Sequence, residues 1–273
     1  MKDIPKICHL YFGGSSPMSQ LMVFTVFSFH KYNPDWRIIV YRTIETDEEL
    51  GENTYVPYYT GKDYFPLLET LSYVEIKNIR VSDFNIKNTV HSFLGSDLFR
   101  TNILYKEGGV YSDFDIIWLK SMDEFVNIDC IGNPNDFDAT VCYHNLTNGH
   151  HSIGCVIAKQ GSKFIDTWMR FQQTVQAPYR YQSFGNKLLA KRFPDLESVQ
   201  RLFPSILALR YETFYPYSIF NLKKLYLEDD ITPISNKNVM GVHWFNGHPL
   251  AQEYIKNRND CSMTFILKQE GYI

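Results

Sequence analysis

The sequence predicts an α/β protein in which helices flank a mixed, Rossmann-like sheet, and three features indicate this fold class. An apolar segment near the N-terminus ends in a glycine pair and precedes a helical pattern. A second helical pattern ends in another glycine pair directly before an apolar extended segment. Strand and helix patterns then alternate almost to the C-terminus, as they do in sheets covered by helices.

Length and composition favour a single domain. The chain has 273 residues, of which 44% are hydrophobic, and this is enough to bury one large core. Neither a Ser/Gly-rich linker nor a repeat of fixed period divides it, so we expect residues 1–273 to form one domain. The net charge of −3 argues against a nucleic-acid surface, which needs a basic stripe.

The first predicted unit is a strand followed by a helix. Residues Ile4 to Gly14 form an apolar run that ends in Gly13-Gly14, and a helix is expected from about Met18 to Tyr32. An α/β nucleotide-binding fold begins in this way. The glycines lack the Gly-x-Gly-x-x-Gly spacing, so dinucleotide binding is not expected. The turn at residues 33–36 leads into a strand from Arg37 to Tyr41.

The next predicted helix runs from Asn88 to Glu107 and stops at Gly108-Gly109. Its apolar residues recur at helical spacing: Val90, Phe93, Leu94, Leu98, Ile103 and Leu104. Asp97 and Arg100 stand three residues apart, so both side chains project from one face. They form either a surface ion pair, worth about 0.3 kcal/mol, or a joint contact with one polar ligand.

Two aspartates interrupt the strand that follows. Asp113 and Asp115 stand between Val110-Tyr111 and the apolar run 116–119. Carboxylates at i and i+2 share one side of an ideal strand, and a bend at the strand end could also converge them. Buried without partners they would be costly, so solvent, a cation or a ligand must meet them. Oxygen ligands favour Mg²⁺ or Mn²⁺, which can hold a diphosphate.

The triplet Asp-Phe-Asp occurs twice, and only its first copy has a suitable context. The second copy, residues 136–138, follows the turn-rich run 133–135, where aspartate commonly caps a helix or is solvated. No helix carrying an acid and an arginine precedes it. The first copy is therefore the predicted metal site.

The run SDLFRTNILYKEGGVYSDFD, residues 96–115, resembles the signature of the DXD-containing sugar-transferase family that includes fungal initiating mannosyltransferases. More distantly it is similar to the glucosyltransferase domains of large clostridial toxins. The resemblance implies a single-domain GT-A type fold. It also implies that Asp97 and Arg100 hold hydroxyls of the donor sugar, that Asp113 reaches the ribose and the metal, and that Asp115 ligates the metal.

Both ends of the chain extend this resemblance. Residues 4–14 resemble the family's opening strand and nucleotide loop, and this implies donor contacts from His9, Tyr11, Phe12 and Gly13. Near the C-terminus, residues 241–249 are similar to a loop that closes over the diphosphate. The similarity nominates His243 as a third metal ligand with Asn246 as its substitute, and Trp244 as a lid near the donor. A lone histidine at a strand end is otherwise usually structural.

Acceptor recognition is expected between these motifs. The polar run 145–152 precedes a predicted strand, Ile153 to Ala158, and a helix that reaches about Gln173. Asn148 could correspond to a family asparagine near the sugar, and His150-His151 read as loop residues rather than as a zinc site. Residues 182–186 stand where relatives carry a Gly-Pro loop. The aromatic run 211–217 is a candidate acceptor wall.

The sequence therefore predicts a metal-dependent, retaining glycosyltransferase, with Asp97, Arg100 and Asp115 as catalytic residues. It would move a hexose from a nucleotide-diphosphate sugar, UDP in preference to GDP, to a hydroxyl of a glycan or other acceptor, with Mn²⁺ or Mg²⁺ bound. Polysaccharide biosynthesis is the expected process. Two alternatives stay open: a non-catalytic nucleotide-sugar or carbohydrate-binding protein, and a glycoside hydrolase that uses Asp113 and Asp115.

The cysteines and the N-terminus favour a cytoplasmic location. Five scattered cysteines, most of them within or beside apolar runs, predict free thiols. The first residues carry neither a signal-peptide pattern nor a membrane span. We expect no transmembrane segment, as in a bacterial or viral enzyme or an excised domain.

Overall fold

The computed structural model describes residues 1, 3–13, 16–44, 59–80, 83, 92–145, 148–176 and 179–273. Within these residues the strands are β1 Ile7–Phe12, β2 Arg37–Thr43, β3 Val74–Ile79, β4 Gly109–Ser112, β5 Ile116–Trp118, β6 Cys130–Ile131, β7 Ala139–Asn145, β8 Asn148–Ser152, β9 Cys155–Ala158, β10 Ile206–Arg210 and β11 Gly241–His243. The α-helices are α1 Gln20–Tyr32, α3 Phe65–Glu69, α4 Ser92–Glu107, α5 Lys163–Gln173, α6 Asn186–Arg192, α7 Leu196–Leu202, α8 Lys223–Tyr226, α9 Pro249–Asn257 and α10 Ser262–Gln269. Short 3₁₀ helices are η2 Met122–Asn127, η3 Tyr211–Thr213 and η4 Thr232–Ser235.

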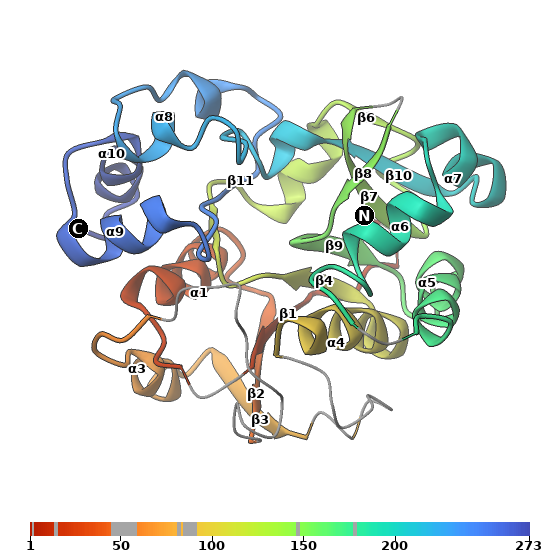
Figure 1. The fold of residues 1–273 in the computed structure, drawn as a ribbon, viewed down its shortest axis with the longest axis horizontal. Coiled ribbons are helices and arrows are strands. Elements are labelled where there is room, and N and C mark those ends of the chain that lie inside the picture. The colour runs from red at the N-terminus through yellow and green to blue at the C-terminus, as the bar shows by residue number, and fades with distance from the viewer. Residues whose placement is uncertain are drawn as a thin grey trace.

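A mixed sheet with the order β3-β2-β1-β4-β9-β7-β10-β6 runs through the molecule, and β8 pairs with β7. The strands β3, β2, β1 and β4 are parallel, whereas β9 runs antiparallel to β4. A separate two-stranded sheet joins β5 to β11. Helices flank the main sheet (Figure 1), so the predicted α/β class is confirmed.

Alternate residues of the parallel strands enter two different cores. In β1, Cys8 and Leu10 join the core on the α1 side of the sheet, whereas Tyr11 packs with Phe99 of α4 on the other side. This alternation follows from the two-residue period of a strand. Helix α1 begins where Ser19 Oγ accepts a hydrogen bond from Met22 N at 3.3 Å, which satisfies one free N–H of its first turn.

A third core lies between α1 and the C-terminal helices. Ile117 of β5 and Val242 of β11 pack there with the fully buried Trp244 and with residues of α8, α9 and α10. Figure 1 shows α9 beside α1, so the C-terminal part of the chain packs against a helix from the N-terminal part. Because β11 is fixed by this core and by its pairing with β5, the residues at its end have a defined position.

The local predictions hold for most of these elements. Helix α4 ends at Glu107 as expected; of the predicted range, residues 88–91 lie outside the described residues. Gly108 and Gly109 follow with φ angles of 68° and 97°, conformations that favour glycine. The second Asp-Phe-Asp copy is structural, because Asp138 accepts a hydrogen bond from Phe164 N of α5 at 3.0 Å.

All five cysteines are free, in agreement with the prediction of reduced thiols. Burial raises the pKa of the Cys8 and Cys142 thiols, which keeps them protonated and unreactive. Within the described part of the chain, no helix has the length and apolar character needed to cross a bilayer.

Candidate functional site

A cavity of about 500 Å³ opens at the carboxyl ends of β1 and β4. Tyr11, Phe12 and Gly13 reach it from the end of β1, and residues 113–115 reach it from the end of β4. These two strands are neighbours in the sheet, although long stretches of chain separate them in the sequence. In open α/β sheets, ligands bind where adjacent strands have such diverging connections. The fold therefore places the cavity where a ligand site is expected.

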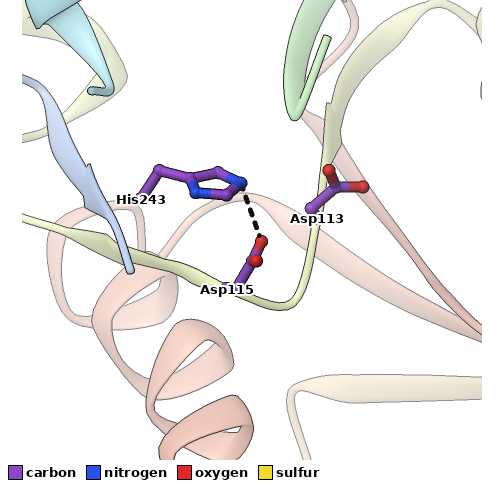
Figure 2. Close-up of side chains that lie close together, drawn as sticks. All are labelled: Asp113, Asp115 and His243. Carbon is purple, nitrogen blue, oxygen red and sulfur yellow. Dashed lines mark ion pairs between the residues drawn. The ribbon is translucent and has the colours of Figure 1, made fainter. Parts of the chain in front are cut away.

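Asp113, Asp115 and His243 converge in this cavity. One oxygen or nitrogen atom of each lies within 4.8 Å of the others, and Figure 2 shows His243 and Asp115 directed toward each other with Asp113 beside them. The two aspartates stand on a turn between β4 and β5, so a bend, rather than an ideal strand, brings their carboxylates together. His243 ends β11, which pairs with β5 through Ile116.

The two carboxyl groups differ in their surroundings. Asp115 Oδ2 accepts a hydrogen bond from Asn246 N at 2.9 Å, and Oδ1 lies 3.1 Å from His243 Nε2. Burial opposes the charge on Asp115, but the His243 ring and the Asn246 N–H outweigh it and lower its pKa. Burial raises the pKa of Asp113, although Arg100 acts in the opposite direction. A bound cation would favour the ionised form of both groups.

Arg100 connects Asp97 of the same helix to the aspartate turn. Its Nη2 lies 3.3 Å from Asp97 Oδ1 and 3.3 Å from Asp113 Oδ1, and its Nη1 donates to Ile153 O. Arg100 and Asp97 are only 3% and 6% exposed, so the alternative of a surface ion pair is wrong. Burial raises the pKa of Asp97 to about 7. A buried arginine shared by two carboxylates is costly to desolvate, so it indicates a role beyond stability.

The imidazole of His243 is fixed by its neighbours. Phe245 N lies 3.2 Å from Nδ1, and Nε2 faces Asp115 Oδ1 at 3.1 Å, so the ring is held with Nε2 directed at the cluster. The Tyr215 ring lies 4.7 Å away between centroids, at 30°. The predicted substitute ligand, Asn246, also lines the cavity, but its Oδ1 accepts a hydrogen bond from Gln252 at 3.2 Å. His243 is therefore the better-placed ligand.

Two predicted donor contacts are corrected by the structure. The fully buried His9 does not line the cavity: its Nε2 bonds to Gly108 O at 2.9 Å and its Nδ1 to Tyr41 Oη at 3.1 Å. It stands inside β1, where the neighbouring strand and the glycine turn cover it. The Trp244 side chain points into the C-terminal core and is not a lid, although its backbone N donates to Asp115 O at 2.8 Å.

Sequence reasoning left open or missed several residues that line the cavity. The segment 182–186 contributes Gln182, which has a φ of 65°, and Asn186. Gly185 of the same segment lies against Asp97, because a Cβ there would stand 2.6 Å from the Asp97 carboxylate. Ser152, the last residue of the polar run 145–152, lines the cavity, and so does Gly154, which has no distinctive motif around it. Only the nonlocal packing of these segments reveals them.

Only some residues of the two candidate acceptor segments line the cavity in the structure. In the run 211–217, Tyr211 and Tyr215 line the cavity, whereas Tyr217 packs in the C-terminal core. The predicted polar run 145–152 falls partly outside the described residues, and the Asn148 side chain is among those not described. The prediction of a loop residue is wrong for His151, which lies in β8 and is buried with Nε2 3.1 Å from Phe193 O.

Fold and site together define the class: an α/β protein that carries an Asp-Asp-His cluster at the switch point of a mixed sheet. Residues 20–137 match the family model described as "Glycosyltransferase sugar-binding region containing DXD motif". That range contains Asp97, Arg100, Asp113 and Asp115. Over these residues the match confirms the resemblance predicted from the sequence, and it supports a glycosyltransferase.

Several solved structures are similar to this chain at low identity. "PaToxG Glycosyltransferase" is 14% identical with a TM-score of 0.49, covering 74% of this chain and 70% of that one. The galactosyltransferase LgtC, solved with donor and acceptor sugar analogs, is 11% identical with a TM-score of 0.44, covering 89% and 87%. GlyE from Streptococcus pneumoniae TIGR4 is 10% identical with a TM-score of 0.46, covering 96% and 63%. Likenesses this remote carry no functional argument. A search of the curated proteins gives no match.

Proposed function

We propose that this glycosyltransferase is metal-dependent and retaining, and that it moves a hexose from a nucleotide-diphosphate sugar to a hydroxyl of a glycan or other acceptor. UDP is the expected nucleotide, in preference to GDP. The observation that carries the proposal is the convergence of Asp113, Asp115 and His243 within 4.8 Å in the cavity. The buried pair Asp97 and Arg100 lies directly beside this cluster.

The chemistry of the cluster fits a divalent cation. Asp113, Asp115 and His243 would hold Mn²⁺ or Mg²⁺, and the imidazole favours Mn²⁺ over Mg²⁺, which prefers oxygen ligands. Asp115 Oδ1 is buried, and apart from its ion pair with His243 it accepts no hydrogen bond from the described residues. When bound, the ion neutralises charge on the departing diphosphate.

Arg100 and Asp97 are placed to address the donor sugar and the charge that develops beside it. The guanidinium is held rigidly by Ile153 O and by the Tyr111 ring, whose centroid is 4.5 Å from Arg100 Cζ. A fixed positive group inside a cavity stabilises developing negative charge without reorganising, and this is often the largest single contribution to catalysis. Tyr11, Phe12 and Gly13 would meet the nucleotide part of the donor.

The cavity supports retention without a covalent intermediate. Asp97, Asp113 and Asp115 are the carboxylates among its described lining residues, and each is engaged by Arg100 or His243. A free carboxylate nucleophile is therefore absent from that set. The acceptor hydroxyl can instead attack from the leaving-group side and give its proton to the departing phosphate oxygen. The hydrolase alternative is disfavoured, because both carboxylates of the turn approach a ligand from the same side.

The second Asp-Phe-Asp triplet supplies a matched control for testing this proposal. Asp115→Asn removes one ligand charge and should abolish Mn²⁺-dependent release of nucleotide from the donor while the fold stays intact. Asp138→Asn is the same change at the same position of the other triplet, where it should cost only about 1 kcal/mol of helix-capping stability. Transfer is assayed by product formation and folding by circular dichroism. Normal turnover by Asp115→Asn would refute the metal-dependent mechanism, and binding without nucleotide release by the wild type would favour the non-catalytic alternative.

A further inference from the structure

The break between β8 and β9 lies against the candidate metal site and is tied to it by backbone atoms. Arg100 Nη1 donates to Ile153 O, and Asp113 N donates to Gly154 O at 2.7 Å. Gly154 N donates in turn to Tyr215 Oη at 3.0 Å. Three distant segments of chain therefore meet at these two residues.

Because Gly154 has no side chain, three side chains of the site can approach its backbone closely. A Cβ at this position would lie 2.6 Å from Tyr215 Oη, 3.1 Å from Asp113 Oδ2 and 3.1 Å from His243 Cδ2. Gly154 is not among the residues with positive φ, so its backbone conformation does not require glycine. The requirement is steric, since a methyl group would push into the side chains that hold the cluster.

Tyr215 transmits the position of this backbone to His243. Its ring lies 4.7 Å from the His243 ring at 30° and 4.7 Å from the Tyr211 ring at 17°. Only 6% of Tyr215 is exposed, and its hydroxyl is anchored by Gly154 N. A phenol fixed at its hydroxyl end and packed along its ring limits how far the neighbouring imidazole can turn.

We propose that Gly154 and Tyr215 form a positioning pair that sets the geometry of Asp113 and His243. The proposal rests on the proposed metal-dependent function. It gives a role to Gly154, which no sequence pattern singles out, and a new role to Tyr215, which the sequence offered only as part of a candidate acceptor wall. Neither residue bonds the donor in this role; they act through the two candidate ligands. Partners that orient metal ligands typically contribute about 10- to 100-fold to metal affinity.

The first test is a rescue experiment. Gly154→Ala should weaken Mn²⁺ affinity by about 10- to 100-fold and lower kcat, with a smaller change in donor KM. Tyr215→Phe alone loses the hydroxyl that Gly154 N anchors and should itself weaken Mn²⁺ affinity. Added to Gly154→Ala, it removes the atom that the new methyl group would meet at 2.6 Å, so the double variant should bind Mn²⁺ more tightly than Gly154→Ala but less tightly than the wild type. Gly154→Ala/Tyr211→Phe is the matched control. It deletes the hydroxyl of the neighbouring tyrosine, which is not among the three atoms nearest to the new methyl group, and should not rescue.

Val199→Ala tests whether a general loss of stability could explain weaker Mn²⁺ binding. This variant changes the core at α7, away from the site, and should lower the melting temperature without changing Mn²⁺ affinity. Wild-type Mn²⁺ affinity in Gly154→Ala, or equal rescue by both tyrosine variants, overturns the positioning pair. A metal-free readout separates this outcome from failure of the proposed function. The His243 imidazole resonances, identified by their loss in His243→Gln, should shift in Gly154→Ala and move part of the way back in Gly154→Ala/Tyr215→Phe. If the wild type binds no divalent ion, the metal-dependent function fails, and unchanged resonances would then reject the positioning pair independently.

Discussion

Asp97 carries a buried carboxyl group, and the charged form suited to its proposed contact with the donor sugar lowers the stability of the fold. Burial penalises its charge and raises its pKa to about 7 in the folded protein, against a usual value of 3.8. Between these pH values the folded protein holds more protons than the unfolded chain. The contribution of Asp97 to the free energy of unfolding therefore falls as the pH rises from about 4 to 7.

Asp97→Asn should remove this pH dependence. Relative to the wild type, the variant should gain unfolding free energy between pH 4 and pH 7, by at most about 4 kcal/mol, because each pKa unit corresponds to about 1.36 kcal/mol. Urea denaturation across this range measures the difference, and groups common to both proteins cancel. Parallel stability curves for the two proteins would show that Asp97 titrates normally.

Trp244 and Phe245 are adjacent but should respond differently to truncation. Trp244→Ala empties part of the C-terminal core and should cost about 3–5 kcal/mol of unfolding free energy. Phe245 lines the cavity and is only partly buried, so Phe245→Ala should cost less stability and raise donor or acceptor KM. Chemical denaturation and steady-state kinetics on both variants test this contrast. A fully stable Trp244→Ala with raised KM would restore the lid interpretation.

Among the elements, the turn from α4 into β4 determines where the aspartates emerge. Gly109 has a φ of 97°, and a Cβ there would lie 2.5 Å from Ile7 O in β1. Gly161, with a φ of 71°, has nothing within 4 Å of the same position. An alanine at either position would strain the backbone, but only an alanine at Gly109 would also clash with a neighbouring atom. Comparing the two substitutions therefore distinguishes the two effects.

Gly161→Ala should cost about 1–2 kcal/mol from left-handed backbone strain alone. Gly109→Ala adds overpacking against β1, worth about 1–3 kcal/mol more, and should also displace Asp113. Thermal or urea unfolding compares the two variants, and Mn²⁺ affinity should fall only in Gly109→Ala. Equal costs for both changes would mean that β1 and β4 can separate without penalty.

Local sequence signals were sufficient for α4 and its glycine stop, because apolar spacing and positive-φ glycines act within a few residues. Asp97, Arg100 and Asp113 follow from the same stretch. The positioning roles of Gly154 and Tyr215, and the burial of Trp244 in the C-terminal core, depend on contacts between residues far apart in the sequence. Local patterns could not predict them. The two-residue period of a strand implies that His243 and Trp244 point to opposite sides, so that only one of them can face the cavity.

At the scale of the molecule, the proposed metal site joins parts of the chain that are far apart. The turn after β4 and the end of β11 would bind one ion together, so the ion should stabilise the folded protein as a whole. Mn²⁺ at about 100 times its dissociation constant should add about 2.7 kcal/mol to the free energy of unfolding.

A thermal-shift screen of nucleotide sugars with and without Mn²⁺ measures this effect and identifies the preferred donor. The largest rise in melting temperature should require both Mn²⁺ and a UDP-sugar, and a chelator should reverse it. In Asp115→Asn the metal-dependent part of the rise should disappear. The absence of any metal-dependent shift with any donor would count against the whole proposal.

The pairing of Ile116 with His243 also determines when the proposed metal site can form during protein synthesis. During synthesis the aspartate turn leaves the ribosome long before β11, and until β11 arrives β5 lacks the strand partner that it has in the folded protein. A nascent or prematurely terminated chain would thus display the Asp-Phe-Asp turn but lack its third ligand. The proposed metal site, and the sugar transfer proposed to depend on it, should therefore be complete only after β11 has been synthesised.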